Sequence, residues 1–283
     1  MRYLSVIQTQ KWLYEFVDQC KKKSIMDLAS IQCEILCTPL KKVFPNVHPQ
    51  DMQYELLNHG LFEPYEWFKI ETIANELEKQ NVWKIVDKEY RYLKNLWNGP
   101  DIPIYIFPIK KGMLGFGNRI RKNGVAYKAA LFLFLSTDLT TDEVKAMLAH
   151  EYNHVCRINL INLPPDKTPL KDSLIIEGLG EYAVKDLHGE KLLAPWTNLY
   201  TFEKAFDIWN THFLPSLNLK GLKNHHPYLY GQKGSPLPKW IGYSIGYQIV
   251  NSYQEKNGPF KNNELYRKST DKLLKGSKFP INE

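Results

Sequence analysis

Residues 147–156 read Met-Leu-Ala-His-Glu-Tyr-Asn-His-Val-Cys, which contains the pattern H-E-x-x-H at His150, Glu151 and His154. Each residue of an α-helix turns about 100°, so two histidines four positions apart are separated by only about 40° around the helix axis. Both imidazoles therefore face the same side and can bind one metal ion. Glu151 directly follows the first histidine, which is where a general base is needed beside a metal-activated water.

The residues before this pattern predict that it lies inside a helix. Thr140 stands three residues before Glu143, the spacing of a capping box, which predicts a helix from about Thr141 to about Asn159. The pattern has only three fixed positions and occurs by chance in about one chain per hundred of this length. By itself it is therefore also compatible with ordinary histidines of an amphipathic helix, and a third ligand is needed to strengthen the prediction of a metal site.

A second predicted helix supplies that third ligand. Residues 163–169 contain three prolines and form a loop long enough to let the following helix pack back on the first. Glu177 and Glu181 lie four apart on this mostly apolar segment, where carboxylates are costly unless they bind a cation or accept hydrogen bonds. We expect Glu177 to complete a His-His-Glu site and Glu181 to hold a ligand histidine from behind. The reverse assignment, with Glu181 as ligand, also fits the spacing.

Glycines interrupt this second helix and recur in a third segment. Gly178 and Gly180 either loosen the helix or allow close packing against the metal helix, and the spacing does not separate these alternatives. Residues 242–247 read Gly-Tyr-Ser-Ile-Gly-Tyr, which would place two phenols on one helix face. Tyr243, with Tyr247 second, is our candidate to stabilise an oxyanion, as phenols do in metallopeptidases. Both tyrosines fit a core position equally well.

The sequence predicts an α+β fold that is mainly helical, with a small sheet next to the H-E-x-x-H helix. Residues 1–97 read as a helical N-terminal part and residues 98–283 as the domain that carries the chemistry. Residues 102–107 and 125–135 are rich in β-branched and aromatic side chains and predict two strands, joined by a hairpin connection around residues 112–118. The second strand directly precedes the metal helix, so we expect it to pair with an extended substrate.

Composition excludes several other classes of protein. The longest apolar run, residues 129–135, is far shorter than the roughly 18 to 20 residues of a membrane-spanning helix. The N-terminus lacks an apolar region of signal-peptide length, and the four cysteines form no disulfide framework, which favours the cytoplasm. The net charge of +7 accompanies no recognition motif, so no nucleic-acid partner is expected. Cys33 and Cys37 are expected in the core rather than on a metal.

H-E-x-x-H followed by a helix with Glu-Gly-x-x-x-Tyr, here starting at Glu177, resembles the gluzincin branch of zinc metallopeptidases. Together with the later Gly-Tyr-x-x-Gly-Tyr segment, this form resembles the YjaZ-like family of predicted zinc-dependent proteases over about residues 100–255. The resemblance implies a thermolysin-like catalytic core with one Zn²⁺ per chain on His150, His154 and Glu177. It also implies Glu151 as general base and a peptide or unfolded protein as substrate. Nothing in the sequence indicates an oligomeric state.

A second hypothesis keeps the metal and removes the catalysis. The protein would then be a regulatory or stress-linked binding protein in which the metal is structural. A fourth protein ligand such as His226 or Cys156 would favour it, because structural zinc sites exclude water.

Overall fold

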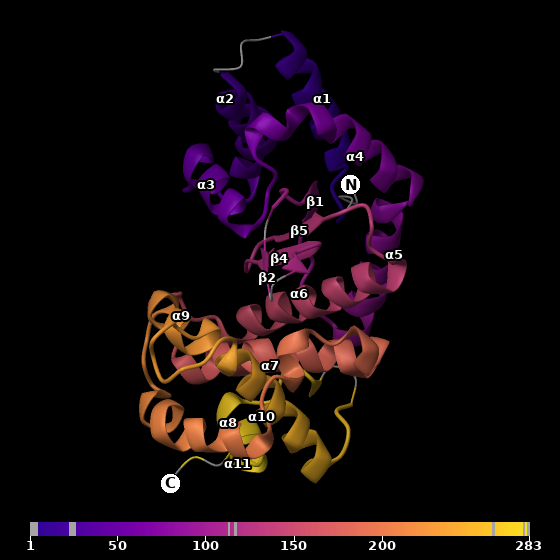
Figure 1. The fold of residues 1–283 in the computed structure, drawn as a ribbon. Helices are drawn as coiled ribbons and strands as arrows, with labels where there is room; N and C mark the ends of the chain where they lie inside the picture. Colours follow the sequence, from indigo (N-terminus) through magenta and orange to yellow (C-terminus); the bar gives the residue numbers. More distant parts are fainter. Residues whose placement is uncertain are drawn as a thin grey trace. The chain divides into compact units, whose positions relative to one another are not determined.

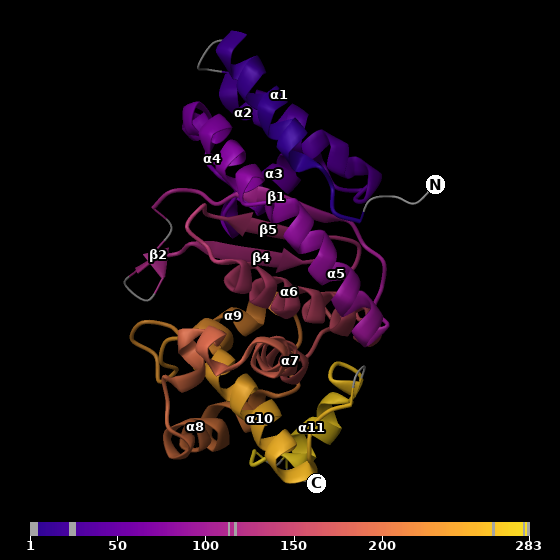
Figure 2. The same ribbon diagram turned by 90° about the vertical axis from the view of Figure 1, so that its right-hand side faces the viewer.

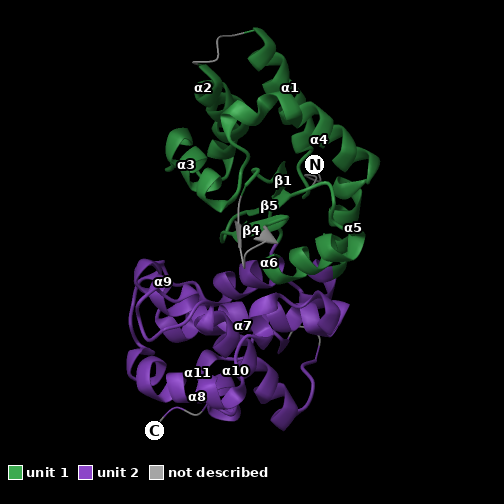
Figure 3. Cartoon of the chain, in the orientation of Figure 1, with its two compact units in different colours: residues 1–92, 101–151 green, residues 93–100, 152–283 purple. Residues whose placement is uncertain are grey.

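The structure is a computed structural model that describes residues 5–22, 27–112, 114–115, 118–261, 264–279 and 281. It is mainly helical with a small sheet, which confirms the predicted α+β class (Figure 1). Two compact units divide the chain: the first comprises residues 1–92 and 101–151, the second residues 93–100 and 152–283 (Figure 3). Helix α6 (Thr141–Ile161) contributes to both. The division into a helical part to residue 97 and a metallopeptidase domain from residue 98 stays a prediction.

The first unit begins with helices that bury one face each. They are α1 (Thr9–Lys22), α2 (Leu28–Gln32), α3 (Pro49–His59), α4 (Trp67–Lys79) and α5 (Val82–Trp97), with a π-helical turn η2 (Cys33–Cys37), and 3-10 turns η3 (Thr38–Lys42) and η4 (Pro64–Glu66). Gly60 ends α3 with a positive φ of 115°, a left-handed conformation that favours glycine. Cys33 and Cys37 are buried and free, as predicted.

Three strands form the sheet of the first unit, in the order β1 (Ile104–Pro108), β5 (Leu131–Leu135), β4 (Lys122–Ala126). β1 runs parallel to β5, and β4 runs antiparallel to β5 as an edge strand. All side chains of β1 and β5 are buried, as expected for strands covered on both faces. The aromatic side chains of β1 and β5 pack with the N-terminal helices in one core, while α5 crosses the strands and α6 lies next to β4 (Figure 2).

The predicted strand over residues 125–135 is wrong as a single strand. Tyr127 N–H donates to the Ala130 carbonyl at 2.9 Å, which closes a tight turn between β4 and β5. Lys128 and Ala129 are exposed there, so the run of apolar residues crosses a turn rather than one strand. β5, which directly precedes α6, is the central strand, so the prediction that this strand pairs with a substrate is wrong; β4 lies at an edge of the sheet.

The predicted hairpin connection is present only locally, because the two flanking strands β1 and β5 are parallel neighbours and not the two arms of one hairpin. A local antiparallel pair, β2 (Leu114–Gly115) and β3 (Asn118–Arg119), lies inside the connection. Residues 113, 116 and 117 of the glycine-rich stretch lie outside the described residues.

The start of α6 follows the sequence closely. Thr140 Oγ1 accepts the Glu143 N–H at 3.2 Å, and Glu143 Oε2 accepts the Thr140 N–H at 2.8 Å, which confirms the predicted capping box. The Arg121 guanidinium also binds the Glu143 carboxylate. Burial acts to raise the pKa of Glu143, but the hydrogen bonds from Thr140 and Arg121 outweigh it and lower that pKa. The start of α6 is thus tied to the residue that precedes β4.

The second unit is helical. It contains α7 (Leu170–His188), α8 (Phe202–Ile208), α9 (Leu222–Tyr230), α10 (Ile241–Asn257) and α11 (Thr270–Gly276), and the short turns η5 (Glu190–Leu192), η6 (Pro195–Asn198), η7 (Trp209–Phe213) and η8 (Leu214–Ser216). α10 crosses α7 at close range (Figure 2). A Cβ at Gly178 of α7 would overlap the carbonyl oxygen of Gly246, and a Cβ at Gly246 would overlap the carbonyl oxygen of Leu174. Gly178 therefore allows close packing, but against α10 rather than against the metal helix.

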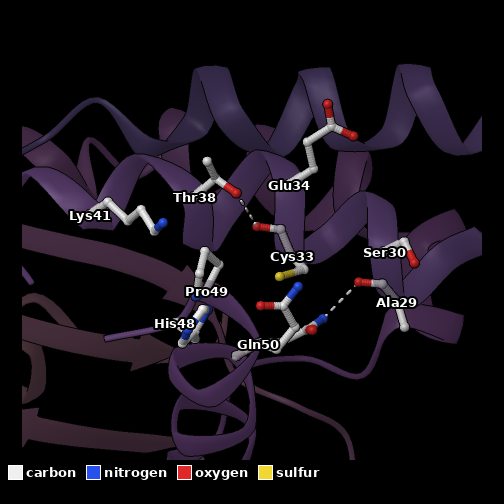
Figure 4. A pocket seen from close by; sticks show the side chains of 10 residues that line it. Ala29, Ser30, Cys33, Glu34, Thr38, Lys41, His48, Pro49 and Gln50 are labelled. Carbon is white, nitrogen blue, oxygen red and sulfur yellow. Dashed lines mark hydrogen bonds between the residues drawn. The ribbon is translucent and has the colours of Figure 1, made fainter. Parts of the chain in front are cut away.

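One further concave feature lies within the first unit. A cavity of about 540 Å³ opens between α2, η2, η3 and the start of α3, and Cys33, Lys41 and Gln50 lie around its interior (Figure 4). Its His48, Cys33 and Glu34 do not come together as metal ligands.

Among the described residues no helix is both long and apolar enough to cross a lipid bilayer.

Candidate metal centre

Three predicted ligands come together at α6 and α7. His150, His154 and Glu177 each offer one ligand atom, and these atoms all lie within 4.8 Å of one another. His154 Nε2 lies 3.3 Å from Glu177 Oε2. The two histidines owe their shared direction to α6, which is continuous from Thr141 to Ile161. Among the residues that the structure describes, no other group of three such side chains has this spacing.

The donor set fits zinc in chemistry, and the separation of His154 and Glu177 fits it in spacing. Two imidazoles and a carboxylate are a common three-ligand set for catalytic zinc, with ligand atoms about 2.0–2.2 Å from the metal. At tetrahedral angles, such ligand atoms lie about 3.3–3.6 Å from each other, and the His154 to Glu177 separation of 3.3 Å matches this value. The side chains of His154 and Glu177 keep 10% and 17% of their surface exposed, so the site is recessed yet still reaches solvent.

The Glu151 side chain lies against the edge strand of the sheet. Glu151 is 9% exposed. A Cβ built on Gly124, in the middle of β4, would lie 2.5 Å from Glu151 Cγ and Cδ. The carboxylate therefore sits over the backbone of β4, on the strand face that Gly124 leaves without a side chain.

Glu181 is buried, with 3% of its surface exposed. Its Oε1 accepts the backbone N–H of Ala194, the residue that precedes the 3-10 turn η6. The carboxylate thus fixes the chain that follows α7. The group of candidate ligands contains Glu177 and not Glu181, in line with the first of the two assignments. The expectation that Glu181 also holds a ligand histidine stays a prediction.

Tyr243 lies in a cluster of aromatic rings at the start of α10. Its hydroxyl donates to the hydroxyl of Tyr230 at 2.9 Å. The rings of Trp196, Tyr230 and Trp240 have centroids 5.0–5.2 Å from that of Tyr243. Trp240 caps α10 with a φ of 63°, a left-handed conformation that is rare for so bulky a residue. The rings around Tyr243 therefore hold a strained backbone conformation in place.

Sequence reasoning missed Tyr230. The only available signal was the density of aromatic side chains over residues 226–243, since Tyr230 belongs to α9 and meets Tyr243 only in the folded chain. The exposed His226 packs against Tyr230 in a tilted arrangement, with ring centroids 4.5 Å apart. Tyr243, the donor candidate, and His226, the candidate fourth ligand, thus both contact one residue that was not named.

Tyr247, the second phenol candidate, is 7% exposed and so is buried to nearly the same degree as Tyr243, which is 9% exposed. Burial raises the pKa of Tyr247, and the nearby carboxylates of Glu190 and Glu181 act in the same direction. Its hydroxyl therefore stays protonated throughout the neutral range.

His225 has a structural place. Its Nε2 lies 2.8 Å from the Leu219 carbonyl, and its Nδ1 lies 2.8 Å from Ser173 Oγ. A carbonyl only accepts, so Nε2 carries the proton and Nδ1 accepts from Ser173. Burial lowers the pKa of His225, although the bond to Leu219 acts to raise it. Ser173 lies one turn before Glu177, so this neutral histidine ties α9 to the ligand helix α7.

The residues that would close the site with a fourth ligand are not part of the ligand group. Neither Cys156 nor His226 belongs to it. Burial raises the pKa of the Cys156 thiol to about 12, which opposes the thiolate form that binds zinc. These two residues therefore give no support to a closed site with a fourth protein ligand.

Comparison with known proteins agrees with this site. The family model described as Predicted Zn-dependent protease (DUF2268) matches residues 82–275. The chain is 34% identical to Uncharacterized protein YjaZ of Bacillus subtilis (strain 168) over 254 residues, covering 88% of this chain and 91% of that protein. It is 27% identical to Uncharacterized protein YjfC of the same organism over 125 residues, 40% of either chain. No solved structure matches this chain.

Proposed function

We propose that this chain, which belongs to the family of predicted Zn-dependent proteases (DUF2268), is a metallopeptidase that hydrolyses peptide bonds in peptides or unfolded proteins. The observation that carries the proposal is the group formed by His150, His154 and Glu177 on two helices. An acidic residue, Glu151, directly follows the first of these ligands in the sequence. One Zn²⁺ per chain would be held by these three residues. When bound, zinc supplies a Lewis acid that polarises a carbonyl and lowers the pKa of water.

Glu151 is the proposed general base. It follows His150 on α6 and does not belong to the ligand group. In this role its carboxylate takes a proton from the attacking water and returns it to the leaving amine. Tyr243 is the proposed donor to the developing oxyanion. Its single hydroxyl proton, which here points to the Tyr230 hydroxyl, would turn to the oxyanion in this role, and Tyr230 would then donate to Tyr243.

The outer edge of β4 is the proposed binding surface for the substrate backbone. Ser136 N–H donates to the Arg121 carbonyl and Tyr127 N–H to the Ala130 carbonyl, which fixes the alternation of bonds between β4 and β5. In this phase Gly124 and Ala126 direct their N–H and C=O groups away from β5. Among the described residues, no backbone bond reaches these outward groups. An extended peptide can therefore pair with β4 beside Glu151, in a thermolysin-like arrangement.

The first experiment measures metal. We expect purified protein to bind about one zinc per chain, and Glu177→Ala, which removes one of the three ligands, to bind it much more weakly. The Glu181→Ala variant is the matched comparison, since Glu181 is also a buried carboxylate of α7. Protein that contains no zinc and takes none up on addition would contradict the proposal.

The second experiment measures hydrolysis. Glu151→Ala and the isosteric Glu151→Gln should keep zinc and lose cleavage of unfolded casein, because they remove the base and leave the ligands. A Glu151→Gln variant that cuts casein as fast as wild type would exclude Glu151 as the base. Sequencing the products of a diverse peptide library would then define the cleavage preference.

The four cysteines of the chain are buried and free. This supports our proposal that the peptidase works in a reducing compartment, the cytoplasm.

A further inference from the structure

We infer that Gly124 is a positioning residue for Glu151: the missing side chain at this point of the edge strand lets the carboxylate of the base lie against the strand backbone. The inference rests on the proposed function, since it names what holds the proposed base in place. It concerns only contacts within the first unit, to which β4 and Glu151 both belong.

The Glu151 side chain occupies the space that a side chain at position 124 would need. A Cβ on Gly124 would lie 2.5 Å from Glu151 Cγ, 2.5 Å from Cδ and 2.7 Å from Oε1. Non-bonded carbon atoms normally approach to about 3.5–4.0 Å. No residue other than glycine can therefore occupy position 124 while Glu151 keeps its place.

The backbone conformation at position 124 does not require glycine. Gly124 lies in the middle of β4, in extended backbone that any residue can adopt, and its φ is not among the positive values of the structure. A glycine inside a strand weakens it, and it often marks a site where another group approaches closely. Here the approaching group is the Glu151 side chain, so the glycine has a steric reason rather than a conformational one.

The same residue faces the proposed substrate edge. Side chains alternate along β4, so Gly124 shares a face with Lys122 and Ala126, while Asn123 and Val125 point to the opposite face. Val125 packs with the N-terminal core, consistent with that alternation. An extended peptide that pairs with β4 would bond to the outward N–H and C=O of Gly124. Because the Glu151 side chain lies over this same residue, the pairing places the bound backbone beside the base.

Gly124→Ala is expected to have two separate effects, one on the position of Glu151 and one on the stability of the protein. The new methyl group meets the Glu151 side chain from Cγ to Oε1 rather than backbone, so we expect this side chain to turn aside while the sheet stays. Without that clash, replacing a strand glycine by alanine stabilises a protein, chiefly through the unfolded state. The substitution should thus displace the base by about 1 Å without unfolding the first unit, since a contact of 2.5 Å must open to about 3.5 Å.

A thermal-unfolding cycle tests the contact without any activity. Gly124→Ala should lower or leave unchanged the Tm of the wild-type protein, yet raise the Tm of Glu151→Ala by about 1–4 °C, because the second protein has no side chain to clash with. Equal shifts in the two backgrounds would overturn the inference.

A kinetic experiment on zinc-loaded protein tests the role. Gly124→Ala should lower kcat by about 10- to 100-fold with KM and zinc content unchanged, the cost of a base misplaced by about 1 Å. The Gly124→Ala/Glu151→Asp double variant should lose less than the product of the two single losses, because aspartate is shorter by one methylene. Ala129→Ser, which adds one atom to an exposed position of the same hairpin, is the control and should cut like wild type.

The two failures are distinguishable. If wild type binds zinc but cleaves no peptide, the proposed function is wrong, and the role of Gly124 in hydrolysis falls with it. If wild type cleaves and Gly124→Ala cleaves equally fast, only the inference about Gly124 is wrong.

Discussion

The two helices that carry the candidate ligands are held in place by different means. α6 begins at a capping box made by its own first residues, and its two histidines are aligned by helix geometry alone. α7 contributes Glu177 through packing: Gly178 meets Gly246 of α10, and Ser173 binds His225 of α9. The histidine pair is therefore a local property of the chain, whereas the third ligand depends on contacts between distant segments.

The site is sensitive to different changes in the two helices. A change that weakens α6 as a whole leaves the spacing of His150 and His154 intact as long as the helix forms. A change between α7 and α10 moves Glu177 relative to both histidines. A change in α6 should thus lower stability more than zinc affinity. A change between α7 and α10 should lower zinc affinity more for the same loss of stability.

Arg157→Ala should cause the largest loss of stability. Arg157 follows His154 by three residues on α6 and is 2% exposed. Its Nη1 donates to the carbonyls of Tyr266 and Lys268 at 2.8 and 2.6 Å, and its Nη2 donates to Thr270 Oγ1 at 2.7 Å. Arg157→Ala takes this donor from two carbonyls and a hydroxyl, and a buried polar group left unsatisfied costs about 1–3 kcal/mol. Denaturant unfolding measures this loss.

The conservative variant Arg157→Lys provides the control. It keeps the charge but offers a single ammonium in place of the planar fork, so its loss should be smaller than that of Arg157→Ala. Because the histidine spacing is local, whatever Arg157→Ala protein remains folded should bind zinc nearly as tightly as wild type. An Arg157→Ala protein as stable as wild type would show that the network contributes nothing.

Gly178→Ala should cost less stability and more zinc affinity. The methyl group would overlap the carbonyl oxygen of Gly246, so α7 and α10 must separate. Overpacking of this kind costs about 1–3 kcal/mol. Glu177 lies next to this contact, so zinc titration should show a larger loss of affinity per unit of lost stability than Arg157→Ala does.

Asp186→Ala is the matched control for Gly178→Ala. It changes an exposed residue of α7 to alanine, away from the contact with Gly246. It should bind zinc like wild type. If Gly178→Ala also does so while it loses stability, the third ligand does not depend on the packing between α7 and α10.

The features of α6, which depend only on residues close together along one helix, could be predicted from the sequence. The capping box, the course of α6 and the histidine pair follow from spacing along one helix, and all three are present in the structure. Glu177 was predicted because a carboxylate on an apolar helix needs a partner, and it does join the ligand group.

What failed in the prediction depends on tertiary contacts. β4 and β5 read as one strand because an apolar run does not reveal where a turn divides it, and the parallel pairing of β1 with β5 leaves no local signal. The glycines of α7 were ambiguous until the backbone of α10 was seen beside Gly178. Tyr230 was missed because its contact with Tyr243 joins two helices through a hydrogen bond between side chains.

Thr140→Ala tests the local anchor of α6 and should have a smaller effect. Thr140 Oγ1 accepts the Glu143 N–H at 3.2 Å, and losing such a cap costs about 1 kcal/mol. Zinc affinity should not change, since the capping box lies ten residues before His150 and the helix persists. Thr140→Ser keeps the hydroxyl and should restore the stability, as measured by thermal unfolding. A loss of zinc affinity in Thr140→Ala would show that the histidine pair depends on more than the helix.

The pH dependence contributed by His225 should be the smallest effect, and it tests the anchor between α9 and α7. Burial lowers the pKa of His225 below 6.5, so the unfolded chain binds this proton more readily than the folded protein does. Stability from this group is therefore complete above pH 6.5 and is lost as the pH falls, by at most about 0.7 kcal/mol between pH 7 and pH 6. His225→Gln, which does not titrate, should lose less stability over this interval than wild type, whereas the exposed neighbour variant His226→Gln should follow wild type. Equal pH slopes for all three proteins in denaturant unfolding would mean that α7 is positioned without the neutral His225.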